Sequence, residues 1–116
     1  MVNTITIIGR ITNEPEIKEL DDGKKVSNIT LAIPRNYKNH DGIYETDFID
    51  CTVWNNIAIN VVEYCKKGDL IGVRGRVETK LYEQDNKKIK DTHVIAEKVT
   101  FLSSRNIEKN NDDIAR

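Results

Sequence analysis

Two aromatic residues interrupt what would otherwise be the polar face of a short alternating segment. Side chains along a strand point alternately to opposite faces, so Ile49, Cys51 and Val53 form one apolar face. Phe48 and Trp54 fall on the other face, among Thr and Asp residues. A flat ring exposed between polar neighbours can stack on another planar group, and nucleobases are the commonest such partners. The same rings could instead be covered by a helix, a loop or another subunit.

Rings and positive charges recur in the segments around this strand. They are Arg35, Tyr37 and Lys38 in the polar segment 35–43, Arg74, Arg76, Lys80 and Tyr82 on the polar face of 69–82, and Lys87 and Lys88 in the polar tip 84–88. Single-stranded nucleic acid needs this combination, because bases stack on rings, at about 1–3 kcal/mol each, while Lys and Arg follow the phosphates. Stacking does not read base edges, so the pattern predicts only a slight sequence preference.

Five strands and one helix would position these side chains. Alternating apolar residues predict strands over 5–11, 26–34, 46–54, 69–82 and 89–102. Pro34 is expected to end strand pairing, which would leave residues 35–43 as an exposed loop or hairpin tip.

The helix is expected from Asn55 to Lys67. Asn55 or Asn56 would be its N-cap and Gly68 would follow its C-terminus. Its apolar stripe is predicted to consist of Ile57, Val61, Tyr64 and Cys65, so Tyr64 is interpreted as a core residue rather than a ligand contact.

This order of elements is that of an OB-fold, a five-stranded all-β barrel with one helix between its third and fourth strands. Gly9, Gly72 and Gly75 offer places for the strong bends that a closed barrel needs. An open β-sandwich or an SH3-like barrel is the alternative, and the position of the helix favours the OB-fold. In that fold one exposed strand face and the flanking loops form the ligand groove.

Composition is consistent with one domain. The 116 residues are 38% hydrophobic, and we expect a folded domain over 1–103 and a disordered tail over 104–116. No apolar run is long enough to span a membrane, and the N-terminus resembles no secretory signal, which predicts a cytoplasmic location. The net charge is −1, so a site for a polyanion has to come from local clusters of cations. Cys51 and Cys65 match no zinc or redox spacing and are expected to be buried and reduced.

An ordered set of motifs resembles the bacterial-type single-stranded DNA-binding proteins. The motifs are Ile8-Gly9-Arg10-Ile11-Thr12, Pro15-Glu16-Ile17, Asn28-Ile29-Thr30-Leu31-Ala32, Arg35-Asn36-Tyr37-Lys38-Asn39, Asp47-Phe48-Ile49 with Val53-Trp54, Tyr64-Cys65-Lys66-Lys67-Gly68 and Gly75-Arg76-Val77-Glu78-Thr79. Together they cover about residues 1–103. The resemblance implies sequence-independent binding of single-stranded DNA in replication, recombination and repair, by a homotetramer that wraps the DNA.

The resemblance also implies roles for individual residues. It assigns base stacking to Tyr37, Phe48, Trp54 and Tyr82, and more loosely it assigns contacts with the phosphates to Arg10, Arg35, Lys38, Arg74, Arg76 and Lys80.

Two positions depart from the family pattern. Glu19 stands where many members have an aromatic residue. Ala115-Arg116 follows the acidic Asp112-Asp113-Ile114, where the family often closes in Pro-Phe. The second departure argues against recruitment of repair proteins through that tip.

Two other functions compete with DNA binding. A metal-dependent nuclease would need converging carboxylates, for which Asp47 and Asp50 with His93 are the candidates. Asp47 and Asp50 are three residues apart on a strand and face opposite sides, and the chain has no phosphate-binding loop or metal-ligand motif. The sequence therefore predicts no enzyme, no metal and no cofactor. An OB-fold that binds RNA or protein stays open as an alternative.

Overall fold

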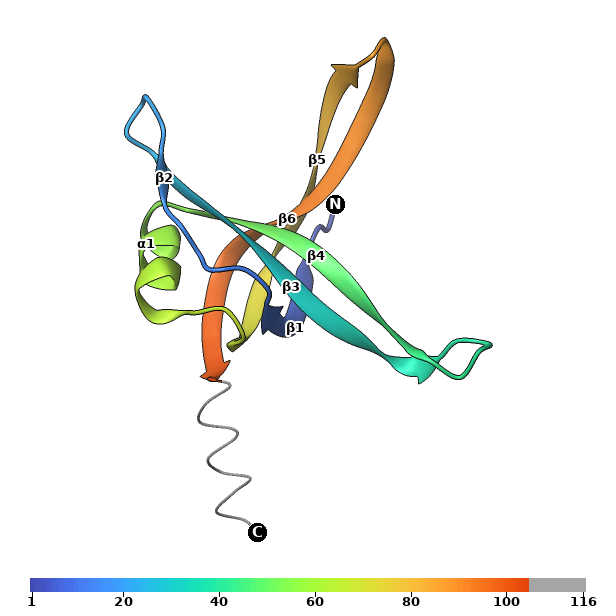
Figure 1. Cartoon of the computed structure of the whole chain (residues 1–116). Helices are drawn as coiled ribbons and strands as arrows, with labels where there is room; N and C mark the ends of the chain where they lie inside the picture. The colour runs from blue at the N-terminus through green and yellow to red at the C-terminus, as the bar shows by residue number, and fades with distance from the viewer. Residues whose placement is uncertain (105–116) are drawn as a thin grey trace.

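Six strands and one helix succeed one another in residues 1–104, the part of the chain that the computed structural model describes (Figure 1). They are β1 (Ile5–Ile11), β2 (Lys18–Glu19), β3 (Lys25–Lys38), β4 (Tyr44–Trp54), α1 (Asn55–Tyr64), β5 (Leu70–Gln84) and β6 (Lys87–Ser103). Except for Ser104, the tail expected over 104–116 lies outside the described residues.

Five of the strands close into a barrel, which confirms the predicted OB-fold with a helix between its third and fourth long strands. The strands pair in the order β1-β5-β6-β4-β3, and β1 also pairs with β3, where Arg10 lies opposite Ala32. The contact between β4 and β6 is parallel and joins Cys51 to Val94. Because the ladder returns to its first strand, the open sandwich is excluded. The two-residue strand β2, which pairs with β3, was not predicted because it is too short to show alternation.

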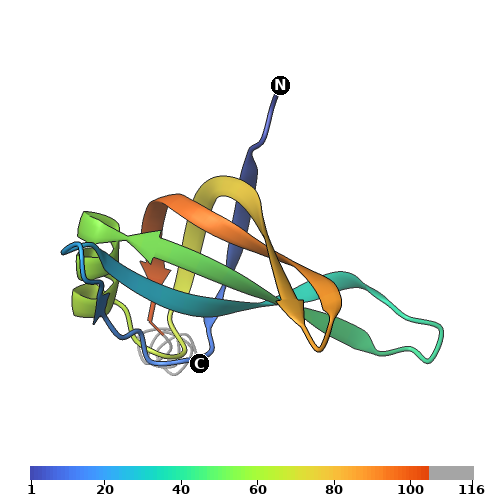
Figure 2. The same cartoon turned by 90° about the horizontal axis from the view of Figure 1, so that it is seen from above.

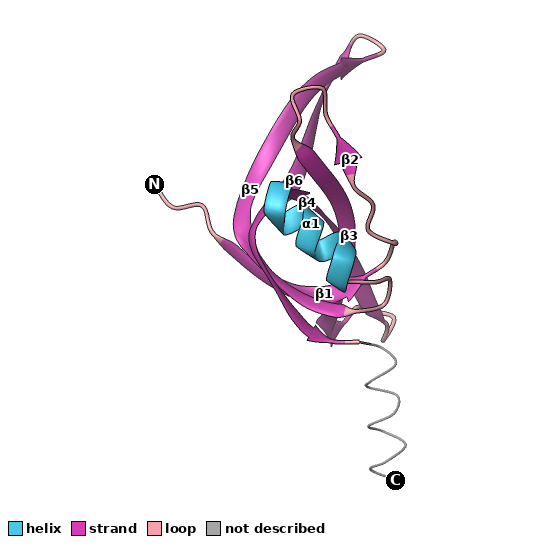
Figure 3. Cartoon of the chain, turned by 90° about the vertical axis from the view of Figure 1, so that its left-hand side faces the viewer, coloured by secondary structure: helices cyan, strands magenta, loops and turns pink. Residues whose placement is uncertain are grey.

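The helix α1 covers one end of the barrel, and two long hairpins, β3–β4 and β5–β6, extend from the barrel (Figures 1, 2 and 3). Ala58 and Val61 of α1 are buried against the core. The strands contribute alternating apolar residues to the same core, among them Ile29, Leu31, Cys51, Val53, Ile71 and Val73. The apolar faces predicted for β3, β4 and the first half of β5 therefore point inward.

The predicted end of the helix at Lys67 was wrong by three residues. The helix ends at Tyr64, because Cys65 adopts an extended conformation with φ −113° and ψ 144°. Cys65 is buried, but the Tyr64 side chain is 67% exposed and is not part of the core. After the helix, the Asp69 carboxylate accepts a hydrogen bond from the Lys66 amide at 2.8 Å, which stabilises the turn toward β5.

Strand pairing continues beyond Pro34, contrary to the expectation that it would end there. Pro34 lies opposite Thr46, and pairing resumes at Lys38 and Tyr44 after a register shift. Proline lacks an N–H, and the irregularity in β3 accommodates this loss. Residues 35–38 of the segment 35–43 are therefore strand. In this article, the end of the β3–β4 hairpin beyond Pro34 and Thr46 is called the arm.

Glycine is required at two places where strands approach closely. The pairing of β5 with β6 shifts register between Arg74 and Gly75, and a Cβ at Gly75 would overlap the carbonyl oxygen of Ile95. A Cβ at Gly9 would lie 2.8 Å from the carbonyl oxygen of Ala32. At Gly72 the nearest atom to such a Cβ, in Ile8, is 3.8 Å away, which is an ordinary contact. Gly9 and Gly75 thus allow the barrel to close, as a bent sheet requires.

Both cysteines are buried and unpaired, as predicted. Burial, with a contribution from Asp50, raises the pKa of Cys51 to about 12, and burial also raises the pKa of Cys65. Both thiols are therefore protonated near neutral pH and pack as small apolar groups. Within residues 1–104, no helix has the length and apolar character needed to cross a membrane.

Candidate nucleic-acid interface

The outer face of β4 carries the two aromatic residues that the sequence singled out. Cys51 and Val53 are buried, so the even-numbered residues of β4 point away from the core. Phe48 is 65% exposed, and Trp54 is partly exposed at the junction of β4 and α1. Trp54 is also the N-cap of α1, in an extended conformation and without a side-chain cap hydrogen bond. Neither ring is enclosed in the core of this subunit.

A polar hollow of about 380 Å³ lies against the part of β4 that separates the two rings. Its lining comes from β3, β4 and the β5–β6 hairpin, and consists of Asn28, Asp50, Thr52, Lys80, Asp91 and His93. Asp50 and Thr52 belong to the same row of β4 as Phe48 and Trp54. Hydrogen bonds fix the floor: Thr52 Oγ1 donates to Asn28 Oδ1 at 3.1 Å, and Thr30 Oγ1 donates to Asp50 at 2.8 Å. The hollow is a place where polar groups of a stacked nucleotide can find partners.

Of the residues in this hollow, only Lys80 is among the DNA contacts predicted from the sequence, whereas Asp50 and His93 are predicted there only as candidates for a nuclease. Asp50 and Thr52 could have been found as the polar members of the Phe48 row. The position of His93 in the hollow could not have been predicted, because it depends on how the β5–β6 hairpin packs beside β4. Its side chain is 7% exposed, and its Nε2 has no hydrogen-bond partner within residues 1–104.

The β5–β6 hairpin flanks the hollow with a ring and several cations. Lys80 lies opposite Asp91 in the pairing of the two strands, and Tyr82, which is 48% exposed, lies opposite Ile89. The hairpin turns at Asp85 and Asn86, whose φ angles of 53° and 64° suit the right-handed twist of the strands. Lys87 and Lys88, next to this turn, are exposed.

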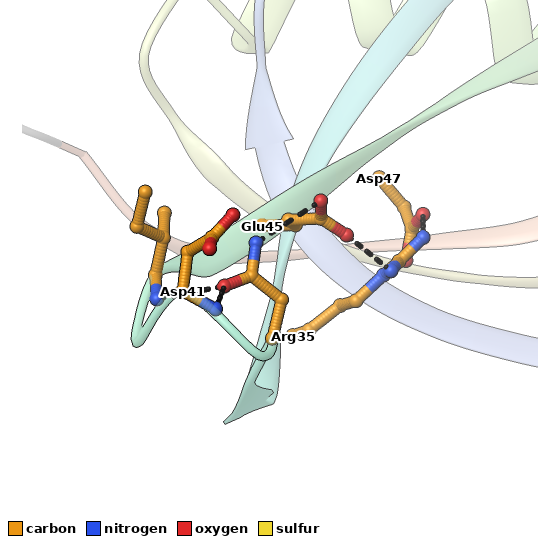
Figure 4. Close-up of polar contacts among 6 residues, drawn as sticks. Arg35, Asp41, Glu45 and Asp47 are labelled. Atoms are coloured by element: carbon orange, nitrogen blue, oxygen red, sulfur yellow. Dashed lines mark hydrogen bonds and ion pairs between the residues drawn. The ribbon is translucent and has the colours of Figure 1, made fainter.

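On the arm, the positive charge of Arg35 is already paired with two carboxylates (Figure 4). Its Nε and Nη2 donate to the two carboxylate oxygens of Asp47 at 3.1 and 2.9 Å, and its Nη1 donates to Glu45 at 2.6 Å. The hydrogen bond with Asp47 raises the pKa of Arg35, and the same bond lowers the pKa of Asp47. Tyr37 is 60% exposed, and its ring centroid is 6.0 Å from the Arg35 guanidinium.

The other predicted phosphate contacts are spread around the barrel. Arg10 lies opposite Ala32, which in turn lies opposite Phe48, so Arg10 is two strands from that ring, or roughly 10 Å. Its Nη1 donates to the Gly68 carbonyl oxygen at 3.0 Å.

Two arginines of β5 are placed differently. Arg76 Nη2 donates to Glu78 at 2.9 Å. Arg74 lies between Thr6 of β1 and Lys98 of β6, on the part of the barrel that β4 does not reach. The structure therefore places Lys80 in the lining of the hollow and Phe48 and Trp54 to either side of it along β4. Tyr37 and Tyr82 lie on the two hairpins, and Arg74 lies apart from all of these residues.

The carboxylates considered for a nuclease do not converge. Asp47 binds Arg35, whereas Asp50 accepts a hydrogen bond from Thr30 on the outer face of the barrel. Within residues 1–104, no group of three or more His, Cys, Asp or Glu side chains is arranged to hold a metal ion.

The closed barrel, with an exposed and a partly exposed ring on one strand face, a polar hollow between them and flanking cations, places the chain in the class of OB-folds, in which a strand face and its flanking loops bind oligonucleotides or oligosaccharides. Comparison with known proteins narrows this class. The chain belongs to the single-strand binding protein family, whose model matches residues 2–102. This is a family of DNA-binding proteins rather than of enzymes.

Three relatives illustrate the similarity. The chain is 44% identical to a single-stranded DNA-binding protein of Bacillus cereus over 107 residues, which are 91% of this chain and 63% of the relative. It is 37% identical to single-stranded DNA-binding protein B of Bacillus subtilis over 110 residues, 94% of this chain and 97% of the relative. Among solved structures, a Plasmodium falciparum SSB in complex with ssDNA matches with a TM-score of 0.79 and 27% identity, over 89% of this chain and 96% of the other. The chain thus spans less than two thirds of the B. cereus protein but nearly all of the shorter B. subtilis one.

Proposed function

We propose that this chain binds single-stranded DNA with little sequence preference, by stacking unpaired bases on Trp54 and Phe48. The observation that carries the proposal is the exposed Phe48 ring and the partly exposed Trp54 ring, which lie on β4 to either side of a polar hollow, in a barrel similar to that of an SSB bound to ssDNA. Tyr82, on the β5–β6 hairpin, would extend the stacking surface, and Tyr37 would add a stacking position beside Arg35 on the arm. Stacking tolerates every base because each has a flat face.

The phosphates are proposed to contact the cations around this surface. The candidates are Arg10, Arg35, Lys38, Arg74, Arg76, Lys80, Lys87 and Lys88. Lys80 has the strongest support, because it lines the hollow. Arg35 and Arg76 would each have to exchange a carboxylate partner for a phosphate.

We further propose that the chain acts by binding alone, as a homotetramer, on single strands exposed during replication, recombination and repair. Such strands arise at the nucleoid in the cytoplasm. The names of the bacterial relatives support the binding of single-stranded DNA in this proposal. Recruitment of repair proteins through the C-terminal tip is not part of the proposal, and that tip lies outside the described residues.

Trp54 is the only Trp in the chain, so its fluorescence reports directly on the proposed site. Adding oligo(dT) should quench this fluorescence through stacking, whereas duplex DNA should not, because its bases are paired. The affinity should fall as salt rises, because binding releases cations from the phosphates and a higher salt concentration makes that release less favourable. Oligo(U) of equal length, used as a competitor at the same salt concentration, measures the preference for DNA over RNA.

The Trp54→Ala substitution tests the stacking role. It should weaken the binding of a labelled oligo(dT), followed by fluorescence polarisation, by about 1–3 kcal/mol. The control is Tyr64→Ala, which removes a ring that is 67% exposed on α1 and should leave the affinity unchanged. A thermal melt checks that both variants fold. A folded Trp54→Ala variant with wild-type affinity would show that the proposed surface is not the binding site.

A further inference from the structure

Tyr44 continues the row of exposed rings on β4 beyond Phe48 and onto the arm. It has the same parity as Phe48 and Trp54 and is 56% exposed. Glu45 and Asp47 both reach Arg35, so the alternation of side chains holds through this part of β4. At roughly 3.3 Å per residue, Tyr44 lies about 13 Å along the strand from Phe48.

A cation accompanies this ring. Lys38 lies opposite Tyr44 in the pairing of β3 with β4, and its Nζ is 5.6 Å from the centroid of the Tyr44 ring. The arm therefore presents, at one place, the two groups that a nucleotide requires: a flat face for its base and a positive charge for its phosphate. Within the described residues, no carboxylate forms an ion pair with Lys38.

The opposite side of the arm is held by the Arg35 ion pairs. Glu45 and Asp47 alternate with Tyr44 and Phe48 along β4, so the carboxylates that bind Arg35 lie on the other face (Figure 4). At the tip, the Asn39 side chain accepts hydrogen bonds from the amides of Asp41 and Ile43, at 2.9 and 3.0 Å. These contacts order the arm before any ligand arrives, which reduces the entropy lost on binding.

We propose that Tyr44, with Lys38, is a further stacking position for an unpaired base, and that the bound strand therefore continues from Phe48 along the arm. This inference rests on the proposed function. It adds a position that neither the sequence pattern nor the similarity to the family assigned.

The test measures Kd for two thymidine oligomers at one salt concentration, with Trp54 fluorescence as the readout. The short oligomer is chosen as the minimum length that saturates the Trp54 signal, and the long one has several more nucleotides. Tyr44→Ala should weaken the binding of the long oligomer roughly tenfold and leave that of the short one unchanged. Tyr44→Thr, a ringless side chain that suits a strand, should repeat this result, and Tyr44→Phe should bind like the wild type.

Tyr64→Ala is again the control, because its ring is exposed on α1 and not on the β4 row. The inference is overturned if folded Tyr44→Ala and Tyr44→Thr bind the long oligomer as tightly as the wild type. It is also overturned if these variants change the native mass of the protein, because Tyr44 would then be a contact between subunits. Failure of the proposed function is distinguishable, since the wild type itself would then show no quenching of Trp54.

Discussion

Arg35 can contact a phosphate, as its motif predicts, only by releasing the carboxylates to which it is bound. Its motif implies a phosphate contact, but its guanidinium is bound to both Asp47 and Glu45. Lys80 lines the hollow beside β4 together with Asp50 and Asp91, but within residues 1–104 it forms no ion pair with a carboxylate. The two cations therefore differ in how much charge they offer to DNA.

The salt dependence of binding separates these two roles. Each phosphate contact contributes about 0.7 to the slope of log Kobs against log salt for single strands. Lys80→Gln should make the slope shallower by about that amount. Arg35→Gln should lower it less, because its charge is already balanced. A decrease for Arg35→Gln equal to that for Lys80→Gln would show that Arg35 exchanges its carboxylates for phosphate in the complex.

The strand residues of the site could be predicted from sequence more reliably than the helical one. Side chains along a strand alternate between two faces, so the burial of Cys51 and Val53 places Phe48 on the exposed face. Tyr64 falls at the edge of the helical stripe, and the early end of α1 turns it outward. The pairing of Arg35 was not predictable, because it depends on the register shift within the arm.

At the scale of elements, the order of strands and the position of the helix were predictable from periodicity, whereas the lengths of the hairpins were not. Pro34 removes one hydrogen-bond donor, but β3 continues past it because β4 supplies a long partner. Exposed strand residues carry little apolar patterning, so nothing in residues 35–38 indicated a strand. Both hairpins extend the strand surface available to a ligand (Figure 1).

Closure of the barrel depends on the missing side chain at Gly75. Gly75→Ala should destabilise the fold by about 3 kcal/mol or more, because the new Cβ would overlap the Ile95 carbonyl oxygen. Gly72→Ala, in the same strand, should cost less than about 1 kcal/mol, since its Cβ meets only ordinary contacts. Urea unfolding of the two variants measures the difference. Equal destabilisation by the two substitutions would mean that the close approach of β5 and β6 does not require glycine at position 75.

At the scale of the whole molecule, the chain binds a polyanion, as proposed, with a net charge of only −1. Long-range attraction is therefore weak, and affinity has to come from rings and from cations placed close to them. A single copy also exposes large apolar side chains away from the β4 row, among them Ile8, Phe101 and Leu102. Exposed apolar surface of this kind is typical of subunit contacts, which supports the proposed tetramer.

Native mass spectrometry tests the assembly and its ligand together. We expect a mass of four chains without DNA, and the same four chains with a bound strand after addition of a long thymidine oligomer. One strand per tetramer would indicate that the DNA runs from subunit to subunit. A single chain that binds one oligomer would contradict the tetramer but would leave the stacking surface intact.

Trp54 occupies the N-cap position, just before the first residue of α1, where Ser, Thr, Asp or Asn would satisfy an amide of the opening turn and add about 1 kcal/mol of stability. The chain instead keeps a bulky indole there and leaves the helix without that bond. If the indole stacks on DNA, this position contributes to DNA affinity at the expense of helix stability. Selection of variants for thermal stability would then favour substitutions at position 54, and the selected proteins would be more stable but would no longer bind single-stranded DNA.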